Sequence, residues 1–359
     1  MSLLELHPSI IFLQKALALA NLYRGFCAPN PAVGAIIVDT KGNILGTGVH
    51  QGYGFPHAEI EALKLTKNAK GATLYVTLEP CCHYGKTPPC IDTIIAAGIT
   101  QVFYGYQDPN PIISGKGELL LKQAGIKCQQ VPVPEINQFY QSYQYWQEHK
   151  KPFITAKIAF SLNGKIAKSN GKPLSLTGKA LQKLTHANRK MSDAILTTAK
   201  TIHFDNPQLN VREEQIIIAK PIYILDSSLK INPNATIFKT AKSITLFHST
   251  HCHPSAIKAM THLGARCISI TKNNDGLSLH EIIVKIGADG VHDLWVEAGG
   301  KCLFSLMKEQ QLQKLLLYIA PKWIAAGQTA FNEQAEYDFN TKSIRWQQYD
   351  NDLVGEIIF

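Results

Sequence analysis

The feature that most constrains the fold is an alternation of short apolar runs with amphipathic segments, which stops once and then restarts. Between residues 141 and 151 the chain is polar and rich in aromatic residues, and this segment ends at Pro152. On both sides of it strands alternate with helices, which favours layered α/β structure. A chain of 359 residues also exceeds the length at which one core usually keeps growing. We therefore expect two α/β domains, spanning residues 1–148 and 149–359.

The positions of the expected elements follow from apolar periodicity and from turn-forming residues. In the first half, Asp39-Thr40-Lys41-Gly42-Asn43 predicts a hairpin turn, and Gly98 follows a helix that begins with proline. The strands expected there cover residues 32–38, 44–49, 73–78 and 102–106, and the helices cover 10–22, 57–67 and 89–97. In the second half we expect helices over 179–190 and 302–308 and strands over 153–159, 194–197, 222–225, 294–297 and 315–320.

Composition argues against several classes of protein. Hydrophobic residues make up 45% and charged residues 18%, as in ordinary soluble enzymes, and no apolar run has transmembrane length. The N-terminus lacks the basic start and apolar stretch of a signal peptide, so a cytoplasmic location is expected. Eight cysteines in such a chain disfavour a disulfide framework. The net charge of +9 is dispersed, which favours phosphate-bearing small molecules over nucleic acid.

Two short clusters in the first half contain residues that ligate zinc. His57-Ala58-Glu59 stands at the expected start of a helix, and Cys90 follows Pro80-Cys81 after eight intervening residues. Catalytic zinc takes three protein ligands and leaves a fourth position for water, which one imidazole and two thiolates would suit. A helix N-terminus favours thiolate because it carries partial positive charge. The sequence therefore predicts a zinc site made by His57, Cys81 and Cys90.

Glu59 is expected to move protons rather than to bind the metal. Zinc lowers the pKa of its water to about 7, and the resulting hydroxide can attack a ring carbon that carries an amino group. In zinc deaminases an H-x-E motif precedes P-C and a later cysteine, and the glutamate is the acid and base. Cys82 and His83 compete with Cys81 as ligands, and Cys81 is preferred because it directly follows Pro80. The pattern predicts a zinc-dependent deaminase of a small heterocycle.

At these residues the chain resembles a specific family, the bifunctional riboflavin biosynthesis deaminase/reductases. The similar stretches are Thr77-Leu78-Glu79-Pro80-Cys81, His83, Gly85-Lys86-Thr87-Pro88-Pro89-Cys90, Pro29-Asn30-Pro31-Ala32-Val33-Gly34, Gly48-Val49-His50 and Gln107-Asp108-Pro109-Asn110-Pro111. The long spacing between the two cysteines fits ordinary cytidine deaminases poorly and is typical of this family. The resemblance covers the whole first domain and implies a cytidine-deaminase-like three-layer α/β/α fold.

The resemblance also implies a substrate and further contacts. The substrate would be a diaminopyrimidinone that carries a ribosylamine phosphate, deaminated hydrolytically with loss of ammonia. One zinc ion per chain would be held by the three ligands named above, with Glu59 as the catalytic proton shuttle. The positions that match the family's substrate pocket are Asn30, His50 and Lys86. A lysine suits a phosphate as a point charge.

The second half resembles the reductase domain of the same family, a dihydrofolate-reductase-like α/β fold that uses NADPH to convert the ribosyl into a ribityl side chain. Similar pieces follow in order at residues 157, 161–165, 193–196, 201, 205–207, 209–212, 224–227, 295–300 and 318–322. From the residues alone, a strand that ends in Glu297-Ala298-Gly299-Gly300 before a helix would let backbone N–H groups approach a phosphate. The pattern is not G-x-G-x-x-G, so a Rossmann domain is not supported.

The reductase resemblance implies two sets of contacts. Those with NADPH are Lys157, Ala159, Ser175, Thr201, Asp205, Ser227, Gly299, Gly300 and Lys301. Those with the substrate are Arg189, Leu209, Arg212 and Glu297. Two arginines suit a ribose phosphate through bidentate hydrogen bonds. The expected partners are this phosphorylated pyrimidine and a second copy of the chain in a homo-oligomer, without nucleic acid or membrane.

The second half departs from the family pattern at two places. Asn163 replaces the aspartate of Ser-Leu-Asp-Gly, and Pro173-Leu174-Ser175-Leu176-Thr177 replaces Ser-x-Trp-Ile-Thr. Proline cannot donate a hydrogen bond, and Ser175 cannot stack as tryptophan would. Three functions stay open. We favour a bifunctional riboflavin-pathway enzyme over a deaminase with a degenerate reductase domain and over a nucleic-acid deaminase, which the basic pI would suit.

Overall fold

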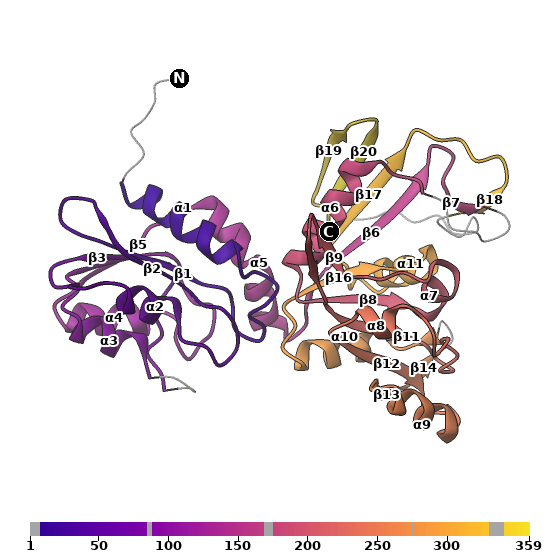
Figure 1. Cartoon of the computed structure of the whole chain (residues 1–359), viewed down its shortest axis with the longest axis horizontal. Coiled ribbons are helices and arrows are strands. Elements are labelled where there is room, and N and C mark those ends of the chain that lie inside the picture. The colour runs from indigo at the N-terminus through magenta and orange to yellow at the C-terminus, as the bar shows by residue number, and fades with distance from the viewer. Residues whose placement is uncertain (1–7, 85–87, 169–174, 274–275, 330–340) are drawn as a thin grey trace. The chain divides into compact units, whose positions relative to one another are not determined.

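The chain divides into two units between Lys150 and Lys151 (Figure 1). This computed structural model describes residues 8–84, 88–168, 175–273, 276–329 and 341–359. The polar, aromatic-rich segment before the boundary is largely helical, because α5 (Pro134–His149) runs through most of it. Lys150 ends this helix in a left-handed conformation, with φ of 54°. Within the described parts of the chain, no helix is long and apolar enough to span a lipid bilayer.

Unit 1 is built on a sheet with the strand order β2-β1-β3-β4-β5. These strands are β1 (Gly34–Val38), β2 (Ile44–Val49), β3 (Thr73–Leu78), β4 (Gln101–Tyr106) and β5 (Lys127–Gln130). β1 is antiparallel to β2 and β3, whereas β3, β4 and β5 are parallel. The other helices are α1 (Pro8–Asn21), α2 (Ala58–Lys64), α3 (Cys90–Ala96) and α4 (Lys116–Gln123). Every element expected from the sequence of this unit is present, while α4, α5 and β5 were not anticipated.

Helices cover both faces of the unit 1 sheet (Figure 1). Successive side chains of a strand point to opposite faces, and all five residues of β1 are buried. On one face the sheet packs against α1 and α5, in a core that includes Leu13, Ala16, Ile36, Ile136 and Tyr140. On the other face it packs against α2, α3 and α4, in a core that includes Ile37, Ala62, Leu74, Ile94 and Leu121. The predicted three-layer α/β/α fold is confirmed.

A close approach between β2 and α2 fixes the start of that helix. A Cβ atom added to Gly48 would come within 2.0 Å of the carbonyl oxygen of Ala58. Any side chain at this position would push the helix off the sheet, so glycine is required. The first turn of α2 and the preceding His57 are thereby held close to the sheet edge.

Unit 2 is built on a nine-stranded sheet with the order β13-β12-β11-β8-β16-β6-β17-β20-β19. The first seven strands run parallel, and β20 and β19 continue the sheet as antiparallel neighbours. Their bounds are β6 (Phe153–Ser161), β8 (Ala194–Thr198), β11 (Pro221–Leu225), β12 (Ser243–Ser249), β13 (Arg266–Ile270), β16 (Asp293–Glu297), β17 (Lys314–Ala320), β19 (Ser343–Tyr349) and β20 (Asp352–Ile358). Small two-stranded pairs add β7 (Lys165–Lys168) with β18 (Gly327–Thr329), β9 (Val211–Glu213) with β10 (Ile216–Ile218), and β14 (Lys272–Asn273) with β15 (Gly276–Leu277).

The unit 2 sheet is also covered on both faces. Its helices are α6 (Lys179–Met191), α7 (Ala199–Asp205), α8 (Ile237–Thr240), α9 (Pro254–His262), α10 (Leu279–Ala288) and α11 (Gly300–Lys308). One core joins the sheet to α10 and α11 and includes Ile154, Leu196, Ile282, Leu294 and Leu303. The other joins it to α6, α8 and α9 and includes Leu181, Ile195, Ile237, Met260 and Trp295. The α/β class predicted for this half is confirmed.

Lys220 carries a buried charge at the start of β11. The residue is 1% exposed, and its Nζ donates to the carbonyl oxygen of Lys190 at 3.2 Å. Burial lowers the pKa of Lys220 to about 8, and the nearby carboxylates of Asp193 and Asp293 offset this only in part. The charged form of this side chain therefore costs folding free energy at neutral pH.

We expect the free energy of unfolding of unit 2 to rise by about 3 kcal/mol from pH 8 to about pH 10.4, where an unfolded lysine titrates. The sign is positive because the unfolded chain still binds the Lys220 proton in this window, whereas the folded chain has lost it. Urea unfolding across that window measures the rise. Lys220→Met should abolish it, and Lys258→Met, at an exposed lysine on α9 that does not act on Lys220, should keep it. An undiminished rise in Lys220→Met would contradict the assignment.

Candidate active sites

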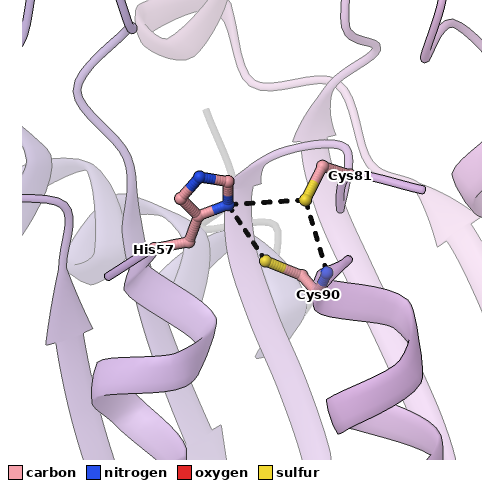
Figure 2. A group of neighbouring side chains, drawn as sticks. All are labelled: His57, Cys81 and Cys90. Carbon is pink, nitrogen blue, oxygen red and sulfur yellow. Dashed lines mark hydrogen bonds between the residues drawn. The ribbon is translucent and has the colours of Figure 1, made fainter. Parts of the chain in front are cut away.

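The three proposed zinc ligands converge at junctions between strands and helices of unit 1 (Figure 2). His57 precedes α2 with an extended backbone, Cys81 follows β3, and Cys90 opens α3. Their ligand atoms all lie within 4.8 Å of one another. Nδ1 of His57 lies 3.1 Å from Sγ of Cys90 and 3.4 Å from Sγ of Cys81. The backbone N–H of Cys90 donates to Sγ of Cys81 at 3.3 Å, which ties the two cysteine segments together.

This donor set fits a tetrahedral zinc ion. Bonds of about 2.3 Å to sulfur and about 2.0 Å to nitrogen put neighbouring ligand atoms roughly 3.5 Å apart. The His57–Cys81 and His57–Cys90 separations are close to that value. Both cysteines are buried and the histidine is half-buried, so the ligands come from inside the fold. Three protein ligands leave one position of a tetrahedron for a further ligand.

Close packing of the three ligands shifts their pKa values in different directions. Hydrogen bonds from Cys90 and His57 lower the pKa of Cys81 to about 4, against the effect of burial. The hydrogen bond with Cys81 raises the pKa of His57 to about 9. The neighbouring Cys81 sulfur and burial hold the pKa of Cys90 well above its usual value. Zinc requires deprotonated ligands, so its binding would release the protons of His57 and Cys90.

Glu59 lies beside this cluster in the first turn of α2. It is 4% exposed and lines a cavity of about 410 Å³, together with His57 and Cys81. Burial raises the pKa of Glu59 to about 7, although the neighbouring His57 lowers it. A cavity of this size suits a small heterocyclic ligand. The carboxyl group of Glu59 and the three proposed zinc ligands therefore lie next to one another at this cavity.

Asn30 and His50 line the same cavity, as the sequence predicted for the pocket. Nδ2 of Asn30 lies 3.3 Å from Nε2 of His50, and Nδ1 of His50 lies 3.0 Å from the carbonyl oxygen of Pro56. Burial lowers the pKa of His50, which favours the neutral ring. Because the carbonyl oxygen of Pro56 requires a donor, Nδ1 carries the proton and Nε2 is an acceptor. Lys86 lies outside the described residues.

A buried chain of hydroxyl groups holds the segment that follows Asn30. The backbone N–H of Gly34 donates to Oγ1 of Thr77 at 3.1 Å, and Oγ1 of Thr77 lies 2.7 Å from the Tyr140 hydroxyl. That hydroxyl donates to the carbonyl oxygen of Ala32 at 2.9 Å. Strand β3 and helix α5 thereby fix the cavity wall between Asn30 and β1.

Asp108, Asn110 and His83 also line the cavity. The sequence assigned Asp108 and Asn110 no site role and indicated His83 only as a rival of Cys81 for zinc. Asp108 accepts from the hydroxyl of Tyr143 at 3.2 Å and from the backbone N–H of Asn110 at 2.8 Å. Burial raises the pKa of Asp108 to about 6. Nδ1 of His83 is buried and has no hydrogen-bond partner among the described residues. The Asp-Pro-Asn-Pro motif after a parallel strand was the available signal, because ligands bind at the carboxyl ends of such strands.

In unit 2 the proposed cofactor residues gather at the carboxyl ends of adjacent parallel strands. Thr201 lies on α7 just after β8, Ser227 follows β11, and Gly299 follows β16. Lys157 and Ala159 lie on β6, the neighbour of β16. A Cβ atom added to Gly299 would meet nothing within 4 Å, so open space faces this backbone. A phosphate could approach there, which fits the proposed contact with NADPH.

The remaining proposed cofactor residues lie near the same edge. Asp205 ends α7, and Gly300 and Lys301 open α11. The carbonyl oxygen of Ser175 accepts from Nζ of Lys322 at 2.6 Å, just beyond the carboxyl end of β17. Pro173 and Leu174 fall outside the described residues.

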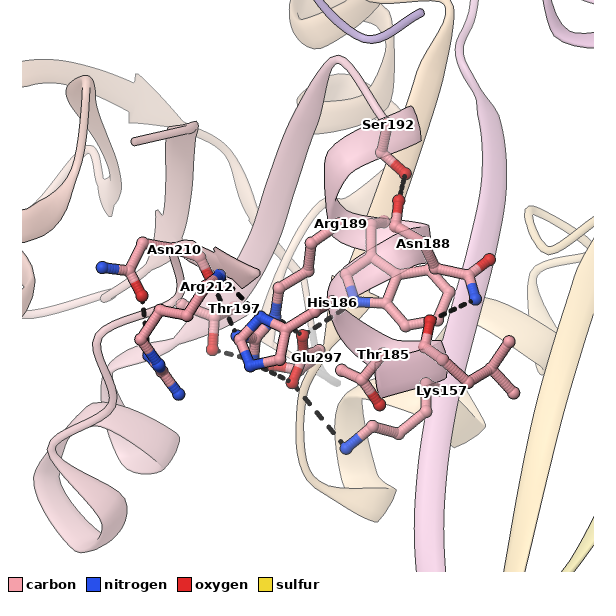
Figure 3. Close-up of polar contacts among 12 residues, drawn as sticks. Lys157, Thr185, His186, Asn188, Arg189, Ser192, Thr197, Asn210, Arg212 and Glu297 are labelled. Carbon is pink, nitrogen blue, oxygen red and sulfur yellow. Dashed lines mark hydrogen bonds and ion pairs between the residues drawn. The ribbon is translucent and has the colours of Figure 1, made fainter. Parts of the chain in front are cut away.

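Glu297 is the centre of a partly buried charge cluster at the end of β16 (Figure 3). Arg189 donates from Nε to its Oε1 at 2.5 Å and from Nη2 to its Oε2 at 3.0 Å. Trp295 donates to Oε1 at 2.8 Å, and Nζ of Lys157 lies 3.7 Å from Oε2. Burial alone would raise the pKa of Glu297, but Arg189 and Lys157 outweigh it and lower the pKa to about 2. Glu297 is therefore a charged hydrogen-bond acceptor at neutral pH.

Two of the other proposed substrate residues, Arg189 and Arg212, meet at Asn210 beside this cluster (Figure 3). Nη1 of Arg189 donates to the carbonyl oxygen of Asn210 at 2.9 Å, and Nη1 of Arg212 donates to Oδ1 of Asn210 at 2.7 Å. Leu209 is buried in the left-handed region, with φ of 47°, a conformation that costs free energy for a residue with a Cβ atom. Because Arg189 already bonds to Glu297 and Asn210, the exposed Arg212 is the better candidate for a phosphate.

Asn163 makes one hydrogen bond that the aspartate of the family pattern could not make, donated by its side-chain amide. Its Nδ2 donates to the carbonyl oxygen of Ile324 at 2.8 Å, and its Oδ1 accepts from the N–H of the same residue at 3.1 Å. Oγ of Ser161 donates to Oδ1 at 2.8 Å. The asparagine therefore links the turn after β6 to the segment after β17, and the substitution is accommodated by the fold.

Comparisons with known proteins assign both halves of the chain. The family model for the cytidine and deoxycytidylate deaminase zinc-binding region matches residues 9–106. The model for the RibD C-terminal domain matches residues 152–355. The riboflavin biosynthesis protein RibD of Aquifex aeolicus is 36% identical over 318 residues, which cover 88% of each chain. That of Haemophilus influenzae is 33% identical over 362 residues, covering 97% of this chain and 95% of the relative.

Solved structures agree over almost the whole length. RibD from Acinetobacter baumannii matches with a TM-score of 0.84 at 28% identity, covering 98% of each chain. The diaminohydroxyphosphoribosylaminopyrimidine deaminase/5-amino-6-(5-phosphoribosylamino)uracil reductase from Thermotoga maritima matches with a TM-score of 0.83 at 27% identity, covering 98% of this chain and 99% of that one. With its two domain matches and these full-length relatives, the chain belongs to the RibD family of riboflavin biosynthesis proteins.

Proposed function

We propose that this chain is a bifunctional enzyme of riboflavin biosynthesis, with residues 1–148 acting as the deaminase and residues 149–359 as the reductase. The observation that carries the proposal is the His57, Cys81 and Cys90 cluster beside Glu59 in a cavity of about 410 Å³. The substrate is a diaminopyrimidinone with a phosphoribosylamino group. Its hydrolytic deamination releases ammonia, and NADPH then reduces the ribosyl to a ribityl side chain.

In the deaminase, each proposed residue has a role that its surroundings support. His57, Cys81 and Cys90 would hold zinc, whose Lewis acidity would activate water. Glu59, enclosed in the cavity, takes a proton from the attacking water and delivers protons to the ring and to the leaving amine. Nε2 of the neutral His50 accepts from Nδ2 of Asn30 and so orients this amide, whose Oδ1 and second N–H would contact the heterocycle.

In the reductase, NADPH supplies the hydride, and the carboxyl edge of the parallel strands is its proposed binding site. Thr201, Ser227 and the backbone of Gly299–Lys301 would contact the cofactor. Arg212 would bind the substrate phosphate, and the buried carboxylate of Glu297 would accept hydrogen bonds from the ribose hydroxyls. The hydrogen bonds of Asn163 support an intact reductase rather than a degenerate one, because the departure from the family pattern is built into the fold.

We also propose that the substrate is a small molecule and that the chain acts in the cytoplasm. A cavity of about 410 Å³ suits one small heterocycle, and the positive charge is dispersed along the sequence. All eight cysteines belong to the described residues and none forms a disulfide, which suits a reducing compartment. RNA or DNA binding at low salt would contradict this proposal.

A homo-oligomer is supported by an apolar surface on the edge hairpin of unit 2. Ile344, Trp346 and Leu353 are 51%, 53% and 43% exposed. The strand register puts Ile344 opposite Ile357 and Trp346 opposite Gly355, so these side chains share one face of the sheet. The solvent face of an antiparallel sheet is normally polar, and an exposed apolar face of this kind is typical of a contact with another chain.

Glu59→Gln is expected to keep zinc and to slow deamination by at least about 100-fold, because the amide cannot take up or deliver the protons of the reaction. Metal content and the release of ammonia from the diaminopyrimidinone measure the two effects. Glu61→Gln is the matched control, since Glu61 pairs with Lys64 on the outer face of the same helix. A deamination rate close to that of the wild type in Glu59→Gln would remove Glu59 from the mechanism.

The purified protein is expected to oxidise NADPH when given the deaminated intermediate, even after chelation of zinc has stopped deamination. The two sites use different units, so loss of the metal should leave the reductase rate within about twofold. Product mass and NADPH absorbance measure the reaction, with Glu297→Gln as the variant expected to lose at least about tenfold in kcat/KM through the loss of charged hydrogen bonds. Absence of turnover at saturating NADPH would favour the degenerate reductase.

Trp346→Glu is expected to shift the chain to the monomer in sedimentation velocity, because it puts a charge into the proposed apolar contact. Trp323→Glu is the control, at a tryptophan that is 76% exposed and lies outside this hairpin. A monomeric wild type, or an oligomer that survives Trp346→Glu, would contradict the proposed surface.

A further inference from the structure

Glu79 lies between β3 and the proposed zinc ligand Cys81, and none of the roles above uses it. The residue is 3% exposed. Its backbone N–H donates to the carbonyl oxygen of Tyr106 at 2.9 Å, which ties the end of β3 to the end of β4. A buried carboxylate requires hydrogen-bond donors to offset its desolvation.

The carboxylate of Glu79 accepts three backbone hydrogen bonds from one segment far along the chain. Oε2 accepts from the N–H of Asp108 at 3.3 Å and from that of Gly115 at 3.0 Å. Oε1 accepts from the N–H of Glu118 at 3.2 Å. The three donors stand at the beginning of the loop between β4 and α4, at its end, and in the first turn of α4. One side chain therefore holds both ends of this loop.

The loop carries part of the cavity wall, because Asp108, Asn110 and Ile113 all line the cavity. Its internal shape is set by its own side chains: Oδ1 of Asp108 accepts from the N–H of Asn110 at 2.8 Å, and Oδ1 of Asn110 accepts from that of Ile112 at 3.1 Å. These short-range bonds do not fix where the loop lies relative to Cys81. The hydrogen bonds to Glu79 fix this position, because Glu79 is only two residues from Cys81.

Tight packing at Gly117 is a second contact between the start of α4 and the segment that leads to Cys81. A Cβ atom on Gly117 would lie 2.2 Å from the carbonyl oxygen of Pro80 and 3.2 Å from Oε1 of Glu79. The start of α4 therefore rests directly on the segment that leads to Cys81. The loop and the proposed metal ligand are parts of one connected structure.

We propose that Glu79 is a positioning residue that sets the distance between the substrate-contacting loop (residues 108–115) and the metal centre of the deaminase. Glu79 also lines the cavity, but both of its carboxylate oxygens are engaged by backbone donors, so we assign it an action through the loop. The proposal rests on the proposed function, because it takes the cavity as the site that binds the diaminopyrimidinone. A glutamine cannot replace Glu79, because its amide nitrogen would face a backbone N–H that needs an acceptor.

The test is Glu79→Gln in the full-length, zinc-loaded protein. We expect KM for the diaminopyrimidinone to rise about tenfold, as for the loss of one buried hydrogen bond, with kcat within about threefold. Zinc content and the kinetics of the reductase should not change. Gly117→Ala should raise KM in the same way with Glu79 intact. Glu118→Gln is the matched control: only its backbone bonds to Glu79, and its carboxyl group pairs with Lys122 and Tyr104 instead.

Amide hydrogen exchange reads the loop without any substrate. The N–H groups of Asp108, Gly115 and Glu118 should exchange faster in Glu79→Gln than in the wild type and in Glu118→Gln. Unchanged exchange at these three groups would overturn the proposal. A Glu79→Gln protein with the KM of the wild type and a lower melting temperature would also overturn it, because Glu79 would then only stabilise the fold. If Glu79→Gln does not fold, Gly117→Ala replaces it in the test: a wild-type KM or unchanged exchange at these N–H groups in Gly117→Ala would overturn the proposal. A wild type that is inactive on the diaminopyrimidinone would count against the proposed function. Amide hydrogen exchange would still test whether Glu79 positions the loop, because it needs no substrate.

Discussion

The two cysteine sulfurs and the imidazole nitrogen of the cluster in unit 1 lie within 4.8 Å of one another. Donor atoms this close together repel one another unless protons or a metal cation lie between them. With protons alone, Cys81 is a thiolate beside a charged His57, while Cys90 keeps its proton. A divalent cation satisfies all three donors at once, since it replaces the protons of His57 and Cys90. The three ligands can meet only where the end of β3 and the starts of α2 and α3 converge. The packing of unit 1 therefore has to bring these three segments together.

Convergence of these three segments depends on contacts between layers rather than on the ligands themselves. Gly48 lets α2 lie against β2 and so brings His57 to the sheet edge. Cys90 donates its backbone N–H to the sulfur of Cys81, which joins α3 to the end of β3. On the opposite face, Tyr140 and Thr77 connect α5 to the cavity wall. The metal position and the cavity are therefore parts of one rigid arrangement in which both sheet faces take part.

The sequence could predict that His57, Cys81 and Cys90 come together because the signals are local. His57 and Glu59, and Pro80 with Cys81, are short motifs at strand and helix ends, and periodicity located those ends. Helix α5 was not recognised because glutamines separate its aromatic residues, and only the packing of Phe139, Tyr140 and Tyr143 shows that they form one buried stripe. The role of Glu79 could not be predicted either. Its partners are backbone groups 29, 36 and 39 residues away, and a backbone N–H leaves no mark in the sequence.

Glu59 and Glu297 are both buried glutamates, yet their surroundings give them opposite chemistry. Around Glu59, burial outweighs the attraction of one imidazole, and the pKa rises to about 7. Around Glu297, Arg189 and Lys157 outweigh burial, and the pKa falls to about 2. A carboxyl group that holds a proton near neutral pH can act as an acid and a base, whereas one clamped by two cations cannot donate a proton there. Glu59 therefore suits the proton transfers of hydrolysis. Glu297 suits the fixed binding of hydroxyl groups, and the proton needed when the ribose is reduced has to come from another donor.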